Sequence, residues 1–243
     1  MLGSLPLTNP FQPTREPRKA GRFRHGAVPV IGLIGGIGGG KSEVAALLKE
    51  RGAVVIDADA VGHELLKDPA VCGRIAERFG AKVLSGAGRQ ASSPPAIDRK
   101  ALGAIVFADM TARRDLEAIL HPPMRSSFLA VIERELSAEG ERNRFVVLDA
   151  AVLLEAGWDD LCDLIVFVDA PREKRMRRVE EQRGWSREML EARERAQWPA
   201  DEKRRRADLV ITNDAGVESL QREVERVEAS LADMSCPVIE TAN

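Results

Sequence analysis

The sequence predicts an α/β fold in which helices flank a parallel five-stranded sheet. Five short apolar runs have the pattern of buried strands: Val28–Ile34, Val54–Ile56, Phe145–Leu148, Leu164–Val168 and Leu209–Ile211. Segments with helical spacing of apolar residues separate them, which is typical of a parallel sheet covered on both faces. A glycine-rich loop directly follows the first run. With 243 residues, the chain is long enough for one such domain with insertions.

The first strand and the first helix frame that loop. Val28–Ile34 is rich in β-branched residues and ends in glycines, as a buried parallel strand does. Beyond the loop, Val44, Leu47 and Leu48 recur at helical spacing, and Gly52 marks the helix end. The sequence therefore predicts a strand, a glycine-rich turn and a helix in immediate succession.

Two segments are too long to be simple connections between strands. Residues 61–144 have mostly helical patterns, which predicts a helical insertion, and residues 172–207 are dense in Arg and Glu. The second segment is either a solvated helical face or a mobile lid whose cations close on phosphates. We expect one domain over residues 28–236, with its core in about 28–60, 145–171 and 208–234, after a disordered extension (1–27) and before a short tail (237–243).

Composition excludes several classes of function. A formal net charge of -2 gives no global electrostatic case for nucleic acid or an anionic membrane. No apolar run approaches the roughly 18 residues that a membrane span needs. Cys72, Cys162 and Cys236 are widely spaced, so neither a disulfide framework nor a zinc site is expected. We expect a cytoplasmic protein, monomeric or weakly self-associating, that acts on a small molecule.

The glycine-rich loop carries the chemistry. Gly35-x-x-x-x-Gly40-Lys41-Ser42 matches the Walker A pattern in full. Phosphates lie against bare backbone N–H groups in such a loop, and the following helix directs its positive end at them. Lys41 reaches the β- and γ-phosphates, and the Ser42 hydroxyl is a Mg²⁺ ligand. The residues expected to bind ATP are Gly36, Ile37, Gly38, Gly39, Gly40, Lys41, Ser42 and Glu43.

Carboxylates at strand ends are the second chemical signal. No Asn-Lys-x-Asp motif is present, so a switch GTPase is disfavoured. Asp149 follows the third run as a Walker B aspartate or as a turn residue. Asp57 and Asp59 follow the second run, and strand alternation would turn both to one side. A carboxylate there would accept a proton from an attacking hydroxyl; the alternative for Asp59 is capping of the helix that follows.

Further motifs, in order over about residues 29–220, resemble the dephospho-coenzyme A kinase family. They are Ile31–Ser42, Val55–Asp59 with His63, Asp98–Phe107, Leu120–Pro122, Leu153–Glu155, Val166–Asp169, Arg193 with Gln197, and Arg206–Asn213. The loop alone is shared by many families, whereas the Asp-Ala-Asp, Leu-His-Pro and Arg-x-x-x-Gln elements are more specific. The resemblance implies ATP-dependent phosphorylation of the ribose 3′-hydroxyl of dephospho-CoA, on a P-loop NTPase core with a helical substrate-binding insertion and a helical lid.

The resemblance also implies roles for individual residues. Asp59 and Lys41 are the expected catalytic residues, with ATP and Mg²⁺ as cofactors. Substrate contacts are expected from Asp59, His63, His121, Glu155, Arg193, Lys203 and Arg206. Alternatives stay open for several of them: surface salt bridges for Arg193, Lys203 and Arg206, and a structural role at a helix start for His121, which precedes two prolines.

The chain departs from the family pattern at three positions. Ile34 and Glu43 stand where the family commonly has Thr, and Ala151 replaces a common Pro. Glu43 suits the start of a helix, where we expect it to point outward. Two other functions remain possible from the sequence: a kinase for another small molecule on the same core, and a non-enzymatic nucleotide-binding regulator.

Overall fold

A computed structural model describes residues 23–85, 96–137 and 145–235. It contains a parallel five-stranded sheet in the order β2-β5-β1-β6-β7, which confirms the predicted fold class. The strands are β1 (Val30–Gly35), β2 (Ala53–Asp57), β5 (Phe145–Asp149), β6 (Leu164–Asp169) and β7 (Leu209–Thr212). Each lies within two residues of the predicted run, because continuous apolar stretches identify strands that are buried on both faces.

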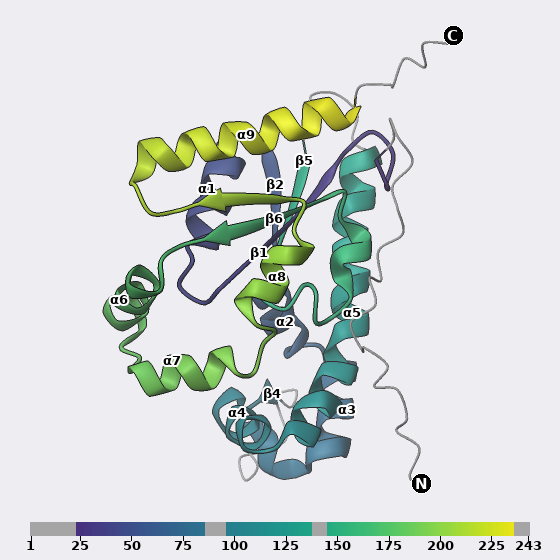
Figure 1. The fold of residues 1–243 in the computed structure, drawn as a ribbon. Helices are drawn as coiled ribbons and strands as arrows, with labels where there is room; N and C mark the ends of the chain where they lie inside the picture. The colour runs from purple at the N-terminus through teal and green to yellow at the C-terminus, as the bar shows by residue number, and fades with distance from the viewer. Residues whose placement is uncertain (1–22, 86–95, 138–144, 236–243) are drawn as a thin grey trace, which may run out of the picture.

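The two faces of the sheet carry different helices. In β1, Ile31 and Leu33 pack with α1 (Lys41–Glu50) and α9 (Val217–Ser235), whereas Val30 and Ile34 pack with α5 (Met110–Ser137). Successive side chains of a strand point to opposite faces, so one apolar run supplies both cores. In Figure 1, α9 runs along the top of the molecule and α5 descends on the other side of the strands. The core is therefore a three-layer sandwich.

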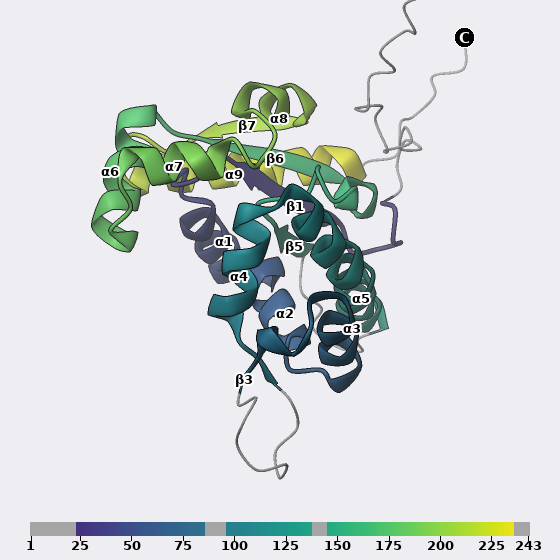
Figure 2. The ribbon, with the colours of Figure 1, turned by 90° about the horizontal axis from the view of Figure 1, so that it is seen from below.

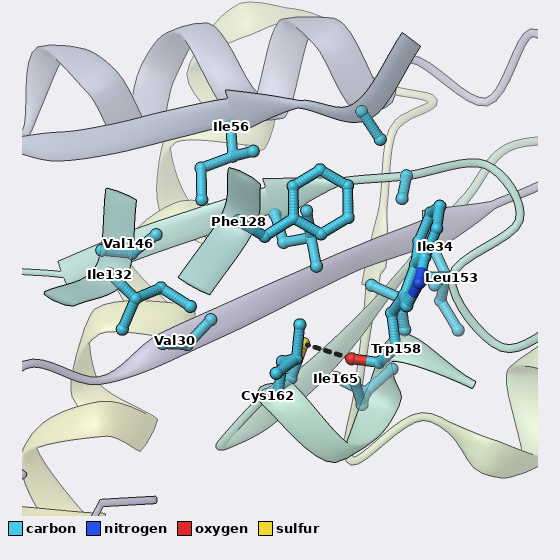
Figure 3. Packing of buried hydrophobic residues seen from close by; sticks show 14 of the residues in the cluster. Val30, Ile34, Ile56, Phe128, Ile132, Val146, Leu153, Trp158, Cys162 and Ile165 are labelled. Atoms are coloured by element: carbon cyan, nitrogen blue, oxygen red, sulfur yellow. Dashed lines mark hydrogen bonds between the residues drawn. The ribbon is translucent and has the colours of Figure 1, made fainter. Parts of the chain in front are cut away.

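The core on the α5 face is built around two aromatic rings. Figure 3 shows Phe128 of α5 and Trp158 packed against side chains of β1, β5 and β6. The two rings meet edge to face with centroids 5.0 Å apart, a favourable geometry for aromatic pairs. Trp158 is the first residue of the 3₁₀ turn η2 (Trp158–Leu161). Its carbonyl oxygen accepts a hydrogen bond from the Cys162 thiol at 3.7 Å. The segment after β5 is thereby fixed beneath the sheet.

The predicted insertion forms a helical unit with a core of its own. It contains α2 (Ala58–Leu65), α3 (Pro69–Phe79), η1 (Ala81–Val83), α4 (Arg99–Ala108) and the first half of α5. The short strands β3 (Leu84–Ser85) and β4 (Ala96–Ile97) pair antiparallel within it. Val71, Cys72, Ile75 and Phe79 of α3 pack against Ile119 of α5. Figure 2 shows this unit below the sheet.

Helix α5 corrects one expectation. His121 does not lie at a helix start, because α5 runs unbroken for 28 residues with Pro122 and Pro123 inside it. Proline at 123 cannot donate to the carbonyl of Ile119, and Arg74 of α3 donates to that oxygen instead at 3.5 Å. Tertiary contacts thus compensate for a helix-breaking pair. Among the described helices, none is long and apolar enough to cross a membrane.

The predicted lid is also helical. It consists of α6 (Arg172–Arg183), α7 (Arg187–Glu194) and α8 (Ala200–Arg206). Ion pairs hold α7 to α6, namely Arg172–Glu191 at 2.9 Å and Arg175–Glu194 at 2.6 Å. Figures 1 and 2 both place α7 beside α4 of the insertion.

Residues 23–27, which the sequence assigned to the disordered extension, pack against the rest of the described structure. Arg24 N–H donates to Asp163 Oδ1 at 2.6 Å, and His25 Nε2 donates to the Leu161 carbonyl at 2.9 Å. Asp163 is fully buried, and its Oδ2 accepts from Val30 N–H. Residues 23–27 therefore belong to the folded domain, since a buried carboxylate depends on these donors. Residues 1–22, Cys236 and the predicted tail lie outside the described residues.

Candidate active site

The glycine-rich loop forms the predicted turn between β1 and α1. Gly38 and Gly40 have φ of +76° and +90°, a region that favours glycine. Gly39 N–H donates to the Gly36 carbonyl at 3.0 Å, and Glu43 N–H donates to that of Gly40 at 3.0 Å. The N–H groups of Gly38, Gly40, Lys41 and Ser42 have no acceptor in the described part of the chain. This arrangement leaves several donors for an anion at the positive end of α1.

Lys41 faces a carboxylate at the end of a neighbouring strand. Its Nζ lies 3.4 Å from Asp149 Oδ1, and each side chain is 17% exposed. Asp149 pairs in register with Asp57 of β2. Burial raises the pKa of Asp149, Lys41 opposes this, and the charges of Asp57 and Asp59 raise the pKa further. Three carboxylates and one ammonium group therefore gather at the carboxyl ends of β2 and β5.

The expected geometry of Asp57 and Asp59 needs correction. Strand β2 ends at Asp57, and Asp59 lies in the first turn of α2, so strand alternation does not relate them. Asp57 is the N-cap, and its Oδ1 accepts from Ala60 N–H at 3.0 Å. The capping role considered for Asp59 thus belongs to Asp57. Asp59 therefore does not cap the helix. It lies close enough to Asp149 for its charge to raise the pKa of that carboxyl.

A cavity of about 220 Å³ opens between the loop and the lid. Its lining combines the backbone of the loop with polar and charged lid side chains, which include Gly35, Gly36, Ile37, Arg172, Arg175, Glu194, Gln197 and Lys203. Arg175 donates to the Ile37 carbonyl at 3.0 Å and to Glu194 at 2.6 Å. Its guanidinium lies so close to Gly36 that a Cβ there would come within 2.9 Å. The cavity is therefore bordered by the first residues of the loop, by three cationic side chains and by the Glu194 carboxylate.

The lid arginines nearest to the loop were not among the residues singled out from the sequence. Arg172 and Arg175 line the cavity, and Arg178 lies within 3.4 Å of two loop carbonyls. These residues are spaced by three along α6, which places them on one helix face. That spacing was available in the sequence. It was obscured because neighbouring positions 174, 177 and 183 also carry Lys or Arg.

Lys203 and Glu155 form a buried ion pair. Lys203 is 1% exposed, and its Nζ donates to Glu155 Oε1 at 2.8 Å, to the Ala151 carbonyl at 2.6 Å and to Gln197 Oε1 at 3.2 Å. Burial lowers the pKa of Lys203, Glu155 opposes this, and the charge of Lys41 lowers it further. Lys203 thus lies near Lys41 of the glycine-rich loop. Its ion pair with Glu155 joins it to the segment after β5 and is not at the surface.

The other expected substrate residues are distributed along the lid and the insertion. Arg193 lies over Trp185 at 4.0 Å and over Phe107 of α4 at 4.6 Å. Arg206 lies over Trp198 at 4.9 Å and donates to Glu202 at 3.2 Å. His63 is hydrogen-bonded to Arg99 at 2.8 Å.

His121 packs edge to face against Trp158, with ring centroids 5.0 Å apart. This packing is the structural use of His121 that the sequence left open.

Glu43 does not point freely outward as expected. Half of its side chain is exposed, but Oε2 accepts from Asn213 Nδ2 at 2.8 Å. Arg178 lies 3.9 Å from the same oxygen. Asn213 follows β7, so a residue at the helix start is joined to the far strand of the sheet. The sequence carried no signal for this contact, because the two residues are 170 positions apart.

Comparisons with known proteins agree with these features. The family model described as dephospho-CoA kinase matches residues 29–219. A dephospho-CoA kinase from Anaeromyxobacter dehalogenans is 43% identical over 204 residues, which are 83% of this chain and 92% of that protein. The crystal structure of a Thermus thermophilus protein has a TM-score of 0.70 at 37% identity, covering 84% of this chain and 98% of that one.

A second solved structure, the dephospho-CoA kinase from Campylobacter jejuni, has a TM-score of 0.58 at 25% identity. It covers 83% of this chain and 96% of its own. The matched span includes the glycine-rich loop, the strand-end carboxylates, the insertion and the lid. The chain belongs to the dephospho-CoA kinase family.

Proposed function

We propose that the protein transfers the γ-phosphate of ATP to the ribose 3′-hydroxyl of dephospho-CoA, giving coenzyme A and ADP. One observation carries the proposal. In a chain of this family, the free N–H groups of the loop and Lys41 lie beside the carboxylates that end β2 and β5. In the proposal, these N–H groups and Lys41 bind phosphate, and a carboxylate accepts the proton. All of them lie at one edge of the sheet, where doubly wound folds bind ligands.

The loop and the lid hold ATP in this proposal. The N–H groups of Gly38, Gly40, Lys41 and Ser42 and the Lys41 ammonium bind its phosphates. Arg175 donates a hydrogen bond to the Glu194 carboxylate. In the ATP complex, a phosphate oxygen would take the place of that carboxylate. Arg175 then neutralises charge on the transferred group. A loose transition state gains mainly from such positioning and neutralisation.

Asp59 acts on the acceptor. The 3′-oxygen forms a bond to the γ-phosphorus while the bond from that phosphorus to the β,γ-bridging oxygen breaks. ADP leaves with the bond electrons, and the hydroxyl proton passes to the Asp59 carboxylate. Asp149 stays beside Lys41 and orients its ammonium group.

Mg²⁺ is part of the proposal because the donors fit it. Ser42 lies in the first turn of α1, and Asp149 provides a carboxylate next to Lys41. Hydroxyl and carboxylate oxygens are the ligands that Mg²⁺ takes together with phosphates. Ser42 and Asp149 would hold the ion, which would neutralise phosphate charge when bound.

The substrate contacts are assigned to both sides of the cavity. Arg193, which faces aromatic rings at the contact of α7 with α4, contacts the acceptor's diphosphate, and His63 binds from the insertion. Lys203 lines the cavity, Glu155 holds Lys203 in place, and Arg206 lies over Trp198, another lining residue. His121 contributes through packing, which supports the insertion.

A coupled ADP-release assay tests the proposal. Dephospho-CoA, nucleoside monophosphates and shikimate are compared as acceptors, with 3′-deoxy-dephospho-CoA as the control for the position of attack. Turnover is expected only with dephospho-CoA, and Lys41→Ala abolishes most of it. Preference for another acceptor identifies a different kinase. ATP binding without turnover identifies a nucleotide-binding regulator.

A further inference from the structure

Asn213 has its side chain in a site that dictates its orientation. The residue is 4% exposed, and its Nδ2 donates to Glu43 Oε2 at 2.8 Å and to the Gly39 carbonyl at 3.3 Å. Its Oδ1 accepts from Arg178 at 3.2 Å. Two acceptors on one side and one donor on the other allow a single placement of the amide. The side chain is thus fixed against the glycine-rich loop.

Arg178 contacts the same part of the loop from the lid. Its guanidinium lies 3.4 Å from the Gly38 carbonyl and 3.3 Å from that of Gly39. Gly40 lies under all three side chains: a Cβ there would meet Asn213 Nδ2 at 2.0 Å, Glu43 Oε2 at 3.1 Å and Arg178 at 3.2 Å. We call Glu43, Arg178 and Asn213 the outer clamp. Its members come from α1, α6 and the end of β7.

The outer clamp acts on carbonyls that determine where N–H groups point. In a planar trans peptide, the C=O of one residue and the N–H of the next point in opposite directions, and the described chain has no cis peptide. Holding the Gly39 carbonyl on the outer side therefore turns the Gly40 N–H to the inner side. Gly40 N–H is one of the groups without an acceptor in the described residues. The clamp thus fixes a phosphate donor from behind.

Glu43 gives the clamp its charge balance. It lies where the family pattern has Thr, and it places a carboxylate 3.9 Å from Arg178. Without an acceptor at this position, Asn213 Nδ2 would lose its shortest hydrogen bond. The anion also offsets the guanidinium charge on the outer side of the loop, so the clamp holds the carbonyls through hydrogen bonds while adding little net charge.

We propose that Asn213, Arg178 and Glu43 are positioning residues that preorganise the glycine-rich loop for ATP. They act through the loop backbone and do not touch the reacting atoms. The inference rests on the proposed function, because it assumes that this loop holds the phosphates of ATP.

Substitution of Asn213 tests the inference through nucleotide affinity. In Asn213→Ala, we expect the dissociation constant for ATP and the KM for ATP to rise about tenfold, the effect of about one lost hydrogen bond. The KM for dephospho-CoA stays within about twofold, because its contacts lie elsewhere. Calorimetric titration with ATP and initial rates provide these values. Glu50→Gln, at the exposed far end of α1, is the control and behaves as the unsubstituted protein.

Moving the carboxylate from position 43 to position 213 distinguishes a positioning role of the clamp from a general effect on protein stability. Asn213→Asp cannot donate and repels Glu43, so ATP binding is expected to weaken beyond the Asn213→Ala level. Adding Glu43→Gln restores a donor toward the introduced carboxylate and recovers affinity, a coupling that a double-mutant cycle measures. Arg178→Gln, on the helix surface, carries the same test if the Asn213 variants fold poorly, and it too is expected to raise the KM for ATP selectively.

Two outcomes overturn the inference and remain distinguishable. If the unsubstituted protein binds ATP and turns over but the clamp variants change only the melting temperature, the clamp is structural. If the unsubstituted protein fails to bind ATP, the proposed function fails and the clamp with it.

Discussion

At the scale of single residues, the three carboxylates near the ends of β2 and β5 have different positions and contacts. Asp57 caps α2, Asp149 faces Lys41, and Asp59 lies one turn into α2. The negative charges of Asp57 and Asp59 both raise the pKa of Asp149. Sequence alone could not separate Asp57 from Asp59, because the separation depends on where the strand stops and the helix begins.

Matched substitutions separate the two aspartates. In Asp59→Asn, we expect kcat to fall on the order of 10²-fold or more, since a positioned proton acceptor is lost. In Asp57→Asn, the amide oxygen still caps the helix, so the fall in kcat is expected to be much smaller. Steady-state rates at saturating ATP and dephospho-CoA provide the measurement. A near-native kcat for Asp59→Asn would remove this residue from the chemistry.

At the scale of elements, α5 shows how packing overrides local preference. Two prolines predict a helix boundary at position 122, yet the helix continues through them. Arg74 supplies one missing donor, and the ring of His121 packs on Trp158. A long helix that covers both the sheet and the insertion gains enough buried area to offset the local cost.

The packing of His121 predicts a pH dependence of stability. Burial lowers the pKa of His121 below its ordinary 6.5, so the unfolded chain takes up the proton first as the pH falls. The associated stability is present above pH 6.5 and is lost as the pH falls through the lowered pKa of the folded state.

The comparison uses His121→Phe, which keeps an aromatic ring against Trp158 but does not titrate. From about pH 7 to about pH 5, we expect the free energy of unfolding to fall more steeply in the unsubstituted protein than in the variant. Urea unfolding at each pH measures it. Parallel curves would contradict a half-buried neutral imidazole.

At the scale of the whole molecule, a few polar contacts join the lid to the rest of the protein. Lys203 of α8 binds Glu155 and the Ala151 carbonyl in the segment after β5. In the middle helix of the lid, Arg193 of α7 meets Phe107 of the insertion. The first contact is buried, and the second lies at an exposed phenylalanine. We therefore expect α8 to stay fixed while α7 moves.

Breaking the buried pair tests that arrangement. In Glu155→Gln, Lys203 keeps its charge in a buried site without its counter-ion, and we expect a loss of about 3 kcal/mol in the free energy of unfolding. Glu64→Gln, which removes the exposed pair with Lys67, is the control and costs less than about 1 kcal/mol. Equal effects of the two substitutions in urea unfolding would show that the Lys203 pair does not anchor the lid.

Local patterns of the sequence determined the sheet and the glycine-rich loop, and they predicted two helical segments between the strands. Apolar runs and loop chemistry are encoded by neighbouring residues, so one sequence suffices to read them. The packing of residues 23–27 was missed, because it depends on Asp163, which lies far along the chain. The same holds for Arg74 and the carbonyl of Ile119.

Only the tertiary structure decided how the site residues are used. It paired Lys203 with Glu155, turned Glu43 toward Asn213 and brought Arg175 over the loop. Each of these contacts joins residues more than 40 positions apart. Such pairings depend on which helices pack together, and packing is a property of the whole chain, whereas periodicity and motif spacing are properties of short segments.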